Sequence, residues 1–183
     1  MIDDPDRRPT LFVIGGLPAS GKTTVSRALA RRTGAAFVRV GTIEAAIVDQ
    51  SSLEHPLGPV GYGVGYRVVA DQLGLGLDTV VESVNPIAIT RDAWLAVGQE
   101  CGARVVEIEI ICGDPEEHRR RAATRTLDIA GLAGPTWEEI CDRAYEVWVR
   151  EPVRIDTAQL SPDQAVHEIL ASGMWHPPDG TVA

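Results

Sequence analysis

The chain has 183 residues and a formal net charge of −9 at pH 7. Its length fits one domain with a substantial core, and its surplus of acidic residues argues against a nucleic-acid partner, because a polyanion is bound by a basic surface. No apolar stretch is long enough to span a bilayer and residues 1–9 contain no signal-peptide core, so we expect a cytoplasmic protein without a membrane partner. The three cysteines are widely spaced and the four histidines lack ligand spacing, which predicts no structural metal site.

The first predicted strand and helix flank a glycine-rich loop. Residues 10–14 are typical of a buried strand, and residues 23–32 have a helical pattern. Between them, residues 16–23 read Gly-Leu-Pro-Ala-Ser-Gly-Lys-Thr, which fits the phosphate-binding pattern G-x-x-x-x-G-K-[ST] at every fixed position. Lys22 is the only lysine in a chain that otherwise uses arginine. A compact ammonium suits phosphates above a tight loop better than a planar guanidinium does, so this arrangement predicts nucleotide binding.

The residues of this loop have distinct expected roles. Glycine at positions 16 and 21 lets successive backbone N–H groups point into one concavity that binds anions. Thr23 is expected to place its hydroxyl on Mg²⁺, and Lys22 to offset the charge that develops on the transferred phosphoryl group. The predicted cofactors are therefore ATP and Mg²⁺. The predicted nucleotide-binding residues are Gly16, Pro18, Ala19, Ser20, Gly21, Lys22, Thr23 and Thr24, joined by Arg121 and Arg125 from a later segment.

Four further strands alternate with helices along the chain. The strands are predicted at residues 36–40, 79–84, 104–111 and 153–156. The helices are predicted at residues 43–49, 62–73, 87–100, 115–125, 136–148 and 162–171. This alternation predicts an α/β fold in which helices cover both faces of a parallel sheet. We expect one domain over residues 1–172 and a fraying, flexible tail over residues 173–183.

The segment between the second and third strands is unusually rich in Gly and Pro. Residues 51–66 contain several glycines around Tyr62 and Tyr66. Such a segment is either a plain connection or an adaptable lid over an acceptor site. We favour the lid, because a long loop inside a compact domain is often functional and this one should reach the carboxyl edge of the sheet.

A second candidate lid covers residues 115–137. Asp114 can cap a helix that begins with proline and places Arg121 and Arg125 on one face. These two side chains could hold the nucleotide phosphates or cover the base. The alternative is a solvated basic helix paired with its own glutamates. We favour the lid because a phosphate-binding loop lies upstream.

Polar residues follow the predicted third strand. Glu82 closes the apolar run at residues 79–81 and should project from the carboxyl end of the strand. It could hold a Mg²⁺-bound water or accept a proton from an acceptor hydroxyl, or it could be a salt-bridged strand-end residue. Asn85 and Arg91 are candidates for acceptor binding, although Arg91 could equally be an ordinary surface charge. Trp94 is expected in the core rather than under a substrate.

From residue 11 to about residue 170 the chain resembles the small P-loop kinases related to chloramphenicol phosphotransferase, gluconate kinase and the nucleotide kinases, whose ATP-binding domain is AAA-type. The resemblance is carried by residues 16–23, 40–44, 80–86, 114–125 and 155–157. It implies a P-loop NTPase three-layer sandwich, with a five-stranded parallel sheet in the order 2-3-1-4-5 and a helical lid. It also implies transfer of the ATP γ-phosphoryl group to a hydroxyl or phosphate of a small molecule.

One position departs from the family pattern. Many relatives that phosphorylate hydroxyls have an aspartate just after the second strand, where it acts as a base, and the matching residue here is Gly41. Either Glu44 or Glu82 replaces that carboxylate, or catalysis relies on positioning and electrostatics, or the activity is lost or unusual. The resemblance favours Glu82 over Glu44, because relatives also tend to have an aspartate after the third strand. The predicted catalytic residues are Lys22, Glu44, Glu82 and Arg125. The predicted acceptor-binding residues are Glu44, Tyr62, Tyr66, Glu82, Asn85 and Arg91.

The sequence thus predicts an ATP-dependent kinase, a monomer or homodimer, that acts on a small hydroxylated metabolite or antibiotic. An amino sugar is the preferred acceptor, because five carboxylates could line that side: Glu44, Asp49, Glu54, Asp71 and Glu82. A nucleoside or nucleotide is the alternative, for which Arg67 or Arg91 would bind a second anion. A regulatory protein that binds a nucleotide without transferring phosphate is the rival from another class.

Overall fold

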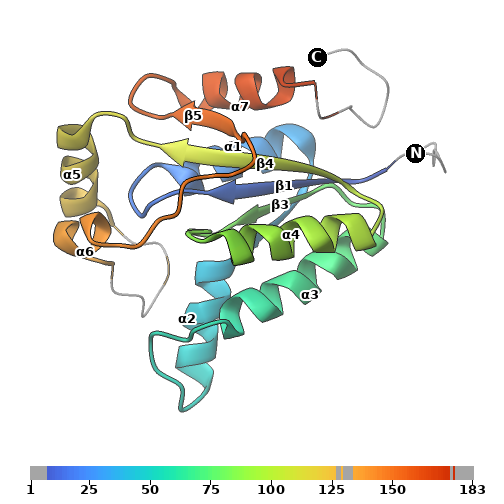
Figure 1. Ribbon diagram of the computed structural model, residues 1–183, viewed down its shortest axis with the longest axis horizontal. Helices are drawn as coiled ribbons and strands as arrows, with labels where there is room; N and C mark the ends of the chain where they lie inside the picture. Colours follow the sequence, from blue (N-terminus) through green and yellow to red (C-terminus); the bar gives the residue numbers. More distant parts are fainter. Residues whose placement is uncertain (1–7, 127–128, 130–133, 174, 176–183) are drawn as a thin grey trace.

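The computed structural model describes residues 8–126, 129, 134–173 and 175. A five-stranded, all-parallel sheet forms its centre (Figure 1). The strands are β1 (Thr10–Gly15), β2 (Ala36–Arg39), β3 (Thr79–Glu82), β4 (Arg104–Ile111) and β5 (Val153–Asp156), in the order β2-β3-β1-β4-β5. This order confirms the one that the resemblance implied.

The helices form a layer on each face of the sheet, and further helices stand at its edge. The helices are α1 (Lys22–Thr33), α2 (Val40–Gln50), α3 (Val60–Gly74), α4 (Ala88–Glu100), α5 (Pro115–Thr124), α6 (Trp137–Cys141) and α7 (Pro162–Ala171). Helices α1 and α7 cover one face, and α3 and α4 cover the other. The arrows of β1 and β4 point toward the side on which α5 and α6 lie (Figure 1). The structure is therefore the three-layer sandwich that the sequence predicted.

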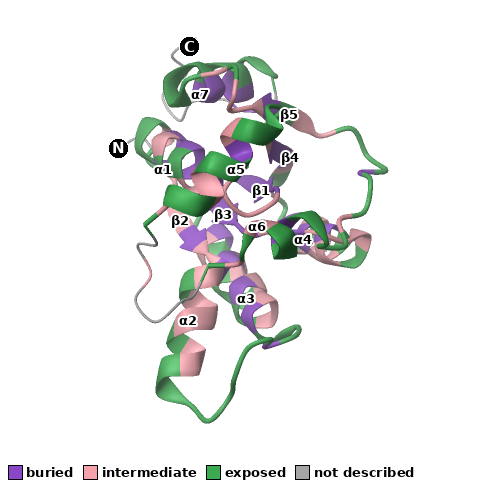
Figure 2. Ribbon diagram, turned by 90° about the vertical axis from the view of Figure 1, so that its left-hand side faces the viewer, coloured by how far each residue is buried: buried purple, intermediate pink, exposed green. Residues whose placement is uncertain are grey.

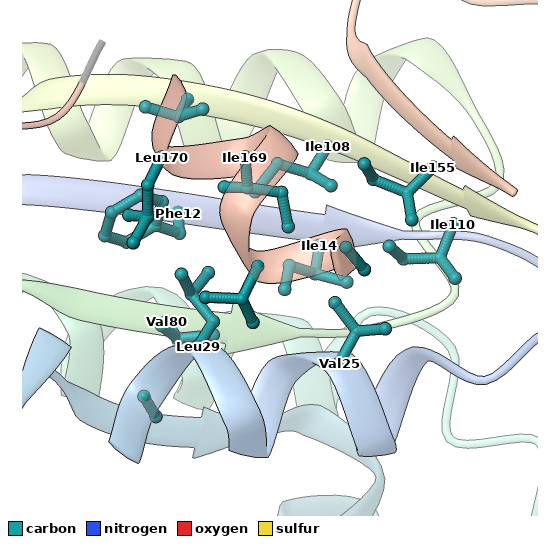
Figure 3. Close-up of a cluster of buried hydrophobic side chains, with 14 of the residues drawn as sticks. Phe12, Ile14, Val25, Leu29, Val80, Ile108, Ile110, Ile155, Ile169 and Leu170 are labelled. Carbon is teal, nitrogen blue, oxygen red and sulfur yellow. The ribbon is translucent and has the colours of Figure 1, made fainter. Parts of the chain in front are cut away.

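Alternating residues of β1 supply the two cores. Phe12 and Ile14 face α1 and α7, where they meet aliphatic side chains of both helices (Figure 3). Leu11 and Val13 point to the opposite face and pack in the cluster that contains Trp94. Successive side chains of a strand point to opposite faces, and a parallel strand covered on both faces is apolar throughout. The whole of β1 is accordingly buried, which fixes the position of the loop that follows it.

Trp94 lies in the core, as predicted, and its ring has no exposed surface. Tyr66 packs edge-on against it, with ring centroids 4.3 Å apart. We expect Trp94→Ala to lower the free energy of unfolding by about 3–5 kcal/mol, because the truncation leaves a large cavity. Urea denaturation measures this change. The control Val147→Ala, whose side chain is 85% exposed, should change the free energy of unfolding by less than about 0.5 kcal/mol; equal effects of the two variants would contradict the packing.

The predicted helix at residues 136–148 is wrong beyond Cys141, where α6 ends. The physical reason is a competing partner for the backbone. The guanidinium of Arg91, far away in sequence, donates to the carbonyl oxygens of Glu146 at 2.7 Å and Val147 at 3.2 Å. The backbone N–H of Glu146, which a helix through residue 148 would direct to the carbonyl of Asp142, instead donates to the carbonyl of Pro86 at 2.8 Å.

The predicted loop at residues 51–66 is wrong for its second half, because α3 already begins at Val60. The glycines there serve close packing rather than a loop. A Cβ on Gly65 would lie 3.2 Å from the ring of Trp94, and a Cβ on Gly61 would meet the side chain of Glu44. Glycine thus lets α3 approach both α2 and α4.

A flexible tail was predicted from residue 173 onward, but the structure places one residue of this segment, Trp175, in the core. Trp175 is buried in the cluster between the sheet, α1 and α7. Its indole N–H donates to the Asp78 carboxylate at 3.2 Å. Residues 174 and 176–183 lie outside the described residues.

Candidate active site

A cavity of about 1370 Å³ opens at the carboxyl ends of the strands. Figure 2 views the molecule from that side, with α5 and α6 in front of the sheet and α2 extending below. The cavity wall combines the phosphate-binding loop, α2, the segment at residues 55–58, the end of β3 and the α5–α6 region. Ligand sites of open α/β sheets lie at this edge, and the volume exceeds that of a typical site for one small molecule. There is room for a nucleotide and a second ligand together.

The phosphate-binding loop has the backbone geometry that its sequence predicts. Gly16 has φ +141° and Gly21 has φ +95°, values that a side chain would strain. A Cβ on Gly16 would also collide with the carbonyl of Ile110 in β4. Gly21 caps the start of α1, so the N-terminus of that helix faces the cavity. Backbone N–H groups at such a helix start bind anions.

Lys22 lies buried beneath this loop, where its Nζ donates to the carbonyl of Leu17 at 2.7 Å. Burial lowers the pKa of Lys22 to about 8, the nearby Glu82 opposes this effect, and Arg125, Arg39 and Arg143 add to it. The ammonium therefore sits where negative charge is scarce. A bound triphosphate would supply that charge and raise the pKa again.

Glu82 and Thr23 meet beside the phosphate-binding loop. The Thr23 hydroxyl donates to Glu82 Oε1 at 2.7 Å, and the Arg39 Nε lies 3.5 Å from the same oxygen. Glu82 Oε2 is buried without a hydrogen-bonding partner in the described part of the chain. A hydroxyl and a carboxylate with an unused oxygen suit Mg²⁺, which prefers oxygen ligands and keeps several waters. No cluster of three or more His, Cys, Asp or Glu side chains suited to a metal occurs among the described residues.

Thr157 and Arg121 form a chain of hydrogen bonds that holds the phosphate-binding loop; we call this chain the first brace. The Thr157 hydroxyl lies 2.7 Å from the carbonyl of Ser20, to which it can donate. Arg121 donates to Thr157 Oγ1 at 2.7 Å, to the Thr157 carbonyl at 3.0 Å and to Glu117 at 2.7 Å. Hydrogen bonds from Arg120 and Arg121 hold the pKa of Glu117 at about 2. Arg121 lines the cavity, but its donors are directed at this brace, a role that sequence reasoning missed.

A second brace joins the loop to the α5–α6 region. His118 of α5 is buried, and its Nε2 lies 2.8 Å from the carbonyl of Pro18. The ring of Trp137 at the start of α6 packs edge-on against His118, with centroids 5.2 Å apart. No sequence signal pointed to His118, because a single histidine in a basic helix has no motif.

Arg125 ends α5 and lines the cavity near Lys22. Its guanidinium makes one long hydrogen bond, 3.4 Å to the carbonyl of Pro135, and burial lowers its pKa. No carboxylate pairs with it among the described residues. A side chain in this position can reach a ligand in the cavity. Of the expected lid at 115–137, residues 127–128 and 130–133 lie outside the described residues.

Glu44, Tyr62 and His55 form a second wall of the cavity. Burial raises the pKa of Glu44 from its ordinary value, while His55 and Arg143 oppose the rise. The carboxylate of Glu44 has no hydrogen-bonding partner in the described part of the chain. The hydroxyl of Tyr62 accepts from the backbone N–H of Asn85 at 2.9 Å, and burial raises its pKa. This wall therefore carries a carboxylate free to meet a ligand.

Three predicted acceptor-binding residues do not line this cavity: Tyr66, Asn85 and Arg91. Tyr66 packs on Trp94 instead, and Asn85 is fully buried. Arg91 is 2% exposed and points its guanidinium at backbone carbonyls. Burial and these contacts assign all three to holding the site's framework rather than to touching an acceptor.

The carboxylates expected on the acceptor side are also fewer than the sequence suggested. Glu44 and Glu82 line the cavity, whereas Asp49, Glu54 and Asp71 do not. Asp49, Glu54 and Asp71 are exposed on or beside α2 and α3. The structure thus removes three of the five charges on which the amino-sugar prediction rested.

Comparison with known families identifies the class of this fold and site. Residues 11–132 match the model of the AAA domain family. The chain therefore belongs to this family, and its glycine loop, strand order and cavity are those of a P-loop NTPase. A comparison with curated proteins finds no match. None of the helices in the described part of the chain is long and apolar enough to cross a membrane.

Several solved structures share the fold. A candidate kinase from Chloroflexus aurantiacus J-10-fl is 17% identical, with a TM-score of 0.71 over 93% of this chain and 100% of that one. A gluconokinase from Sinorhizobium meliloti 1021 is 20% identical, with a TM-score of 0.62 over 90% and 91% of the two chains. Chaetomium thermophilum Kti12, solved with ADP-AlF3, is 17% identical, with a TM-score of 0.66 over 94% and 100%. At these identities the likeness establishes the P-loop kinase-type fold.

Proposed function

We propose that the protein is an ATP- and Mg²⁺-dependent kinase that transfers the γ-phosphoryl group to a hydroxyl of a small molecule. One observation carries this proposal: a single cavity joins the phosphate-binding loop around Lys22 to a second wall around Glu44. A protein that only hydrolyses a nucleotide has no need of the second wall. A gluconokinase is among the similar structures, and it supports the same reaction class.

On the nucleotide side, the loop amides at the start of α1 bind the phosphates and Lys22 with Arg125 balances their charge. Thr23 and Glu82 would hold Mg²⁺, the Glu82 carboxylate through water. When bound, this ion neutralises charge on the β- and γ-phosphates. Thr157 and His118 keep the loop in its anion-binding shape.

On the acceptor side, Glu44 is the better of the two candidate bases, although the resemblance favoured Glu82. Glu82 already accepts the Thr23 hydroxyl and lies beside Arg39, whereas Glu44 faces the cavity without a partner in the described part of the chain. The acceptor oxygen forms a bond to the γ-phosphorus while the bond to the β–γ bridging oxygen breaks. ADP leaves with that electron pair, and the hydroxyl proton passes to Glu44.

Glu44→Gln is therefore expected to lower kcat by about 10²–10⁴-fold. A base works only as a carboxylate, and burial raises the pKa of Glu44 above its ordinary value. The kcat of the unaltered protein should thus fall as the pH drops through that raised pKa. This acid limb should be missing in Glu44→Gln. The measurement is acceptor-dependent ADP release as a function of pH.

Asp49→Asn is the matched control, because Asp49 lies exposed on the same helix outside the cavity. It should keep both the rate and the acid limb. A Glu44→Gln variant with an unchanged rate and an unchanged pH profile would show that Glu44 is not the base.

The identity of the acceptor is the finer part of the proposal. A hydroxylated metabolite or antibiotic fits the cavity volume. The prediction of an amino-sugar acceptor now depends on Glu44 and Glu82 alone, because the other three acidic residues on which it was based lie outside the cavity. A nucleoside or nucleotide would need its second anion held by cavity arginines, since Arg67 and Arg91 do not line the cavity.

A regulatory nucleotide-binding protein is the second candidate function. Gly41 lines the cavity without supplying a carboxylate, and Kti12 shares the fold. The two functions differ in one observable: a kinase releases ADP in response to an acceptor, whereas a regulatory protein binds ATP without such a response. Mg²⁺-ATP turnover with and without a panel of hydroxylated compounds separates them.

A further inference from the structure

The cavity is far more cationic than the whole chain. Among the described residues, its wall contains six cationic side chains, Lys22, Arg27, Arg39, Arg121, Arg125 and Arg143, but three carboxylates, Glu44, Glu82 and Glu139. The chain as a whole carries a net charge of −9. Cations thus gather in the cavity of an acidic protein, and such a site favours anionic ligands.

Arg143 stands apart from the other cations of the cavity. Arg121 is held by Glu117 and Thr157, and Arg39 lies beside Glu82. Arg143 has no ion pair and no hydrogen bond within the described ranges of the chain. An arginine on a cavity wall without a partner has all of its five donors available to a ligand.

The position of Arg143 is between the two halves of the cavity. It lies just beyond α6 and shares the cavity wall with Glu44 and Tyr62. Its charge acts on Lys22 on the nucleotide side and on Glu44 and Tyr62 on the other side. An anion on an acceptor held at Glu44 would therefore fall within its reach, beside the site of phosphoryl transfer.

The segment that carries Arg143 is fastened to the loop after β3. Glu146 donates its backbone N–H to the Pro86 carbonyl at 2.8 Å and accepts the Ala88 N–H on its carboxylate at 2.6 Å. Arg91 holds the same segment through the Glu146 and Val147 carbonyls. These contacts hold the backbone close to Arg143, which lies three residues before Glu146 on the cavity wall, and a preordered segment lowers the cost of binding a ligand there.

The indole of Trp148 completes this anchor, since the Arg91 guanidinium stacks on it at 4.2 Å. The Arg91 guanidinium thus donates hydrogen bonds to four carbonyls, those of Asn85, Pro86, Glu146 and Val147. A buried arginine used in this way is a positioning residue for the Arg143 segment.

We propose that Arg143 binds an anionic group of the acceptor, so that the substrates are hydroxylated compounds with a carboxylate or a phosphate rather than amino sugars or neutral alcohols. This proposal rests on the proposed kinase function. A guanidinium presents parallel N–H donors that match either anion bidentately. The phosphate-binding loop, Lys22 and Arg125 already serve the nucleotide, which leaves Arg143 for the second ligand.

Matched pairs of acceptors test the substrate class. D-gluconate is compared with D-gluconamide, D-glycerate with glycerol, and AMP with adenosine, with glucosamine as the cationic compound. Acceptor-dependent ADP release should favour the anionic member of at least one pair by about 100-fold in kcat/KM, as expected for a lost charge-assisted contact. Preference for neutral compounds or glucosamine would overturn this proposal while leaving the kinase function intact.

Arg143→Gln tests the residue. It should raise KM for the anionic acceptor by about 10–100-fold and leave KM for ATP within about twofold. The control Arg150→Gln changes an exposed arginine of the same segment that pairs with Glu107 and Asp92 outside the large cavity. It should behave as the unaltered protein does. An equal rise in KM for ATP in Arg143→Gln would make Arg143 a nucleotide ligand and overturn the proposal.

A binding measurement keeps the test independent of the acceptor panel. Inorganic sulfate is titrated calorimetrically into the complex of the protein with Mg²⁺ and the non-hydrolysable analogue AMPPNP, which fills the γ-phosphate position. Sulfate should bind at least about 10-fold more weakly to Arg143→Gln than to the unaltered protein. Equal affinities would overturn the proposal. Absence of acceptor-dependent ADP release together with Arg143-dependent sulfate binding would instead locate the failure in the kinase function.

Discussion

Replacing Lys22 with methionine is expected to lower the rate of ATP-dependent phosphoryl transfer by about 10³-fold, because the preorganised charge at the transferring group is lost. The same change should not lower stability. Burial depresses the pKa of Lys22 to about 8, so the folded protein holds the ammonium at a cost that methionine removes. Loss of activity without loss of stability separates a catalytic role from a structural one. ADP release and urea denaturation measure the two quantities.

The pH dependence of stability offers an independent check on Lys22. Between its folded pKa of about 8 and its ordinary value of 10.5, the unfolded chain binds a proton that the folded protein has released. The contribution of this group to stability therefore increases as the pH rises through that window. Lys22→Met should lack this increment. Arg31→Met, an exposed position of the same helix, should retain both the activity and the increment; a Lys22→Met variant that turns over normally would contradict the account.

Glu82→Gln is expected to lower the transfer rate by about 10²-fold and to raise the Mg²⁺ concentration needed for half-maximal rate by about 10-fold. Glutamine can still accept the hydrogen bond that Thr23 makes to Oε1, but it lacks the charge that holds the ion. The neighbouring Arg39 also loses its anionic partner. A Mg²⁺ titration of ADP release measures both effects.

Glu109→Gln is the control for Glu82, since Glu109 is also a buried strand glutamate but lies outside the cavity, paired with Arg154. Its Mg²⁺ requirement should not change. Glu44→Gln should lower the rate but leave the Mg²⁺ requirement unchanged, because Glu44 belongs to the second wall of the cavity. Equal transfer rates for Glu82→Gln and the unaltered protein would contradict the assignment of Glu82 to the Mg²⁺ site.

Local pattern was sufficient for the strands and for the phosphate-binding loop, whereas the order of the strands came from the family resemblance. The apolar runs of β1 and β3 are short, buried and bounded by polar or glycine residues, and the loop motif fixes its own backbone shape. The position of Glu82 at the end of β3 followed directly from such a run. These features depend on residues close together in the chain, so a single sequence contains them.

The features that sequence reasoning missed depend on distant residues. The non-helical segment after α6 is held by Arg91, 55 residues from the Glu146 carbonyl to which it donates. The contact of His118 with the Pro18 carbonyl joins positions 100 residues apart. Arg143 reaches the cavity because its segment is tied to the loop after β3, which no local pattern encodes. Gly61 and Gly65 read as loop residues because their packing partners lie on other helices.

The most direct test of the central claim is ADP release from Mg²⁺-ATP with hydroxylated compounds of differing charge, with mass analysis of the products. The account predicts release that depends on an anionic acceptor, a phosphorylated form of that acceptor, and loss of both in Lys22→Met. Tight ATP binding without acceptor-dependent release or a phosphorylated product, across the whole panel, would contradict it and favour a regulatory nucleotide-binding protein.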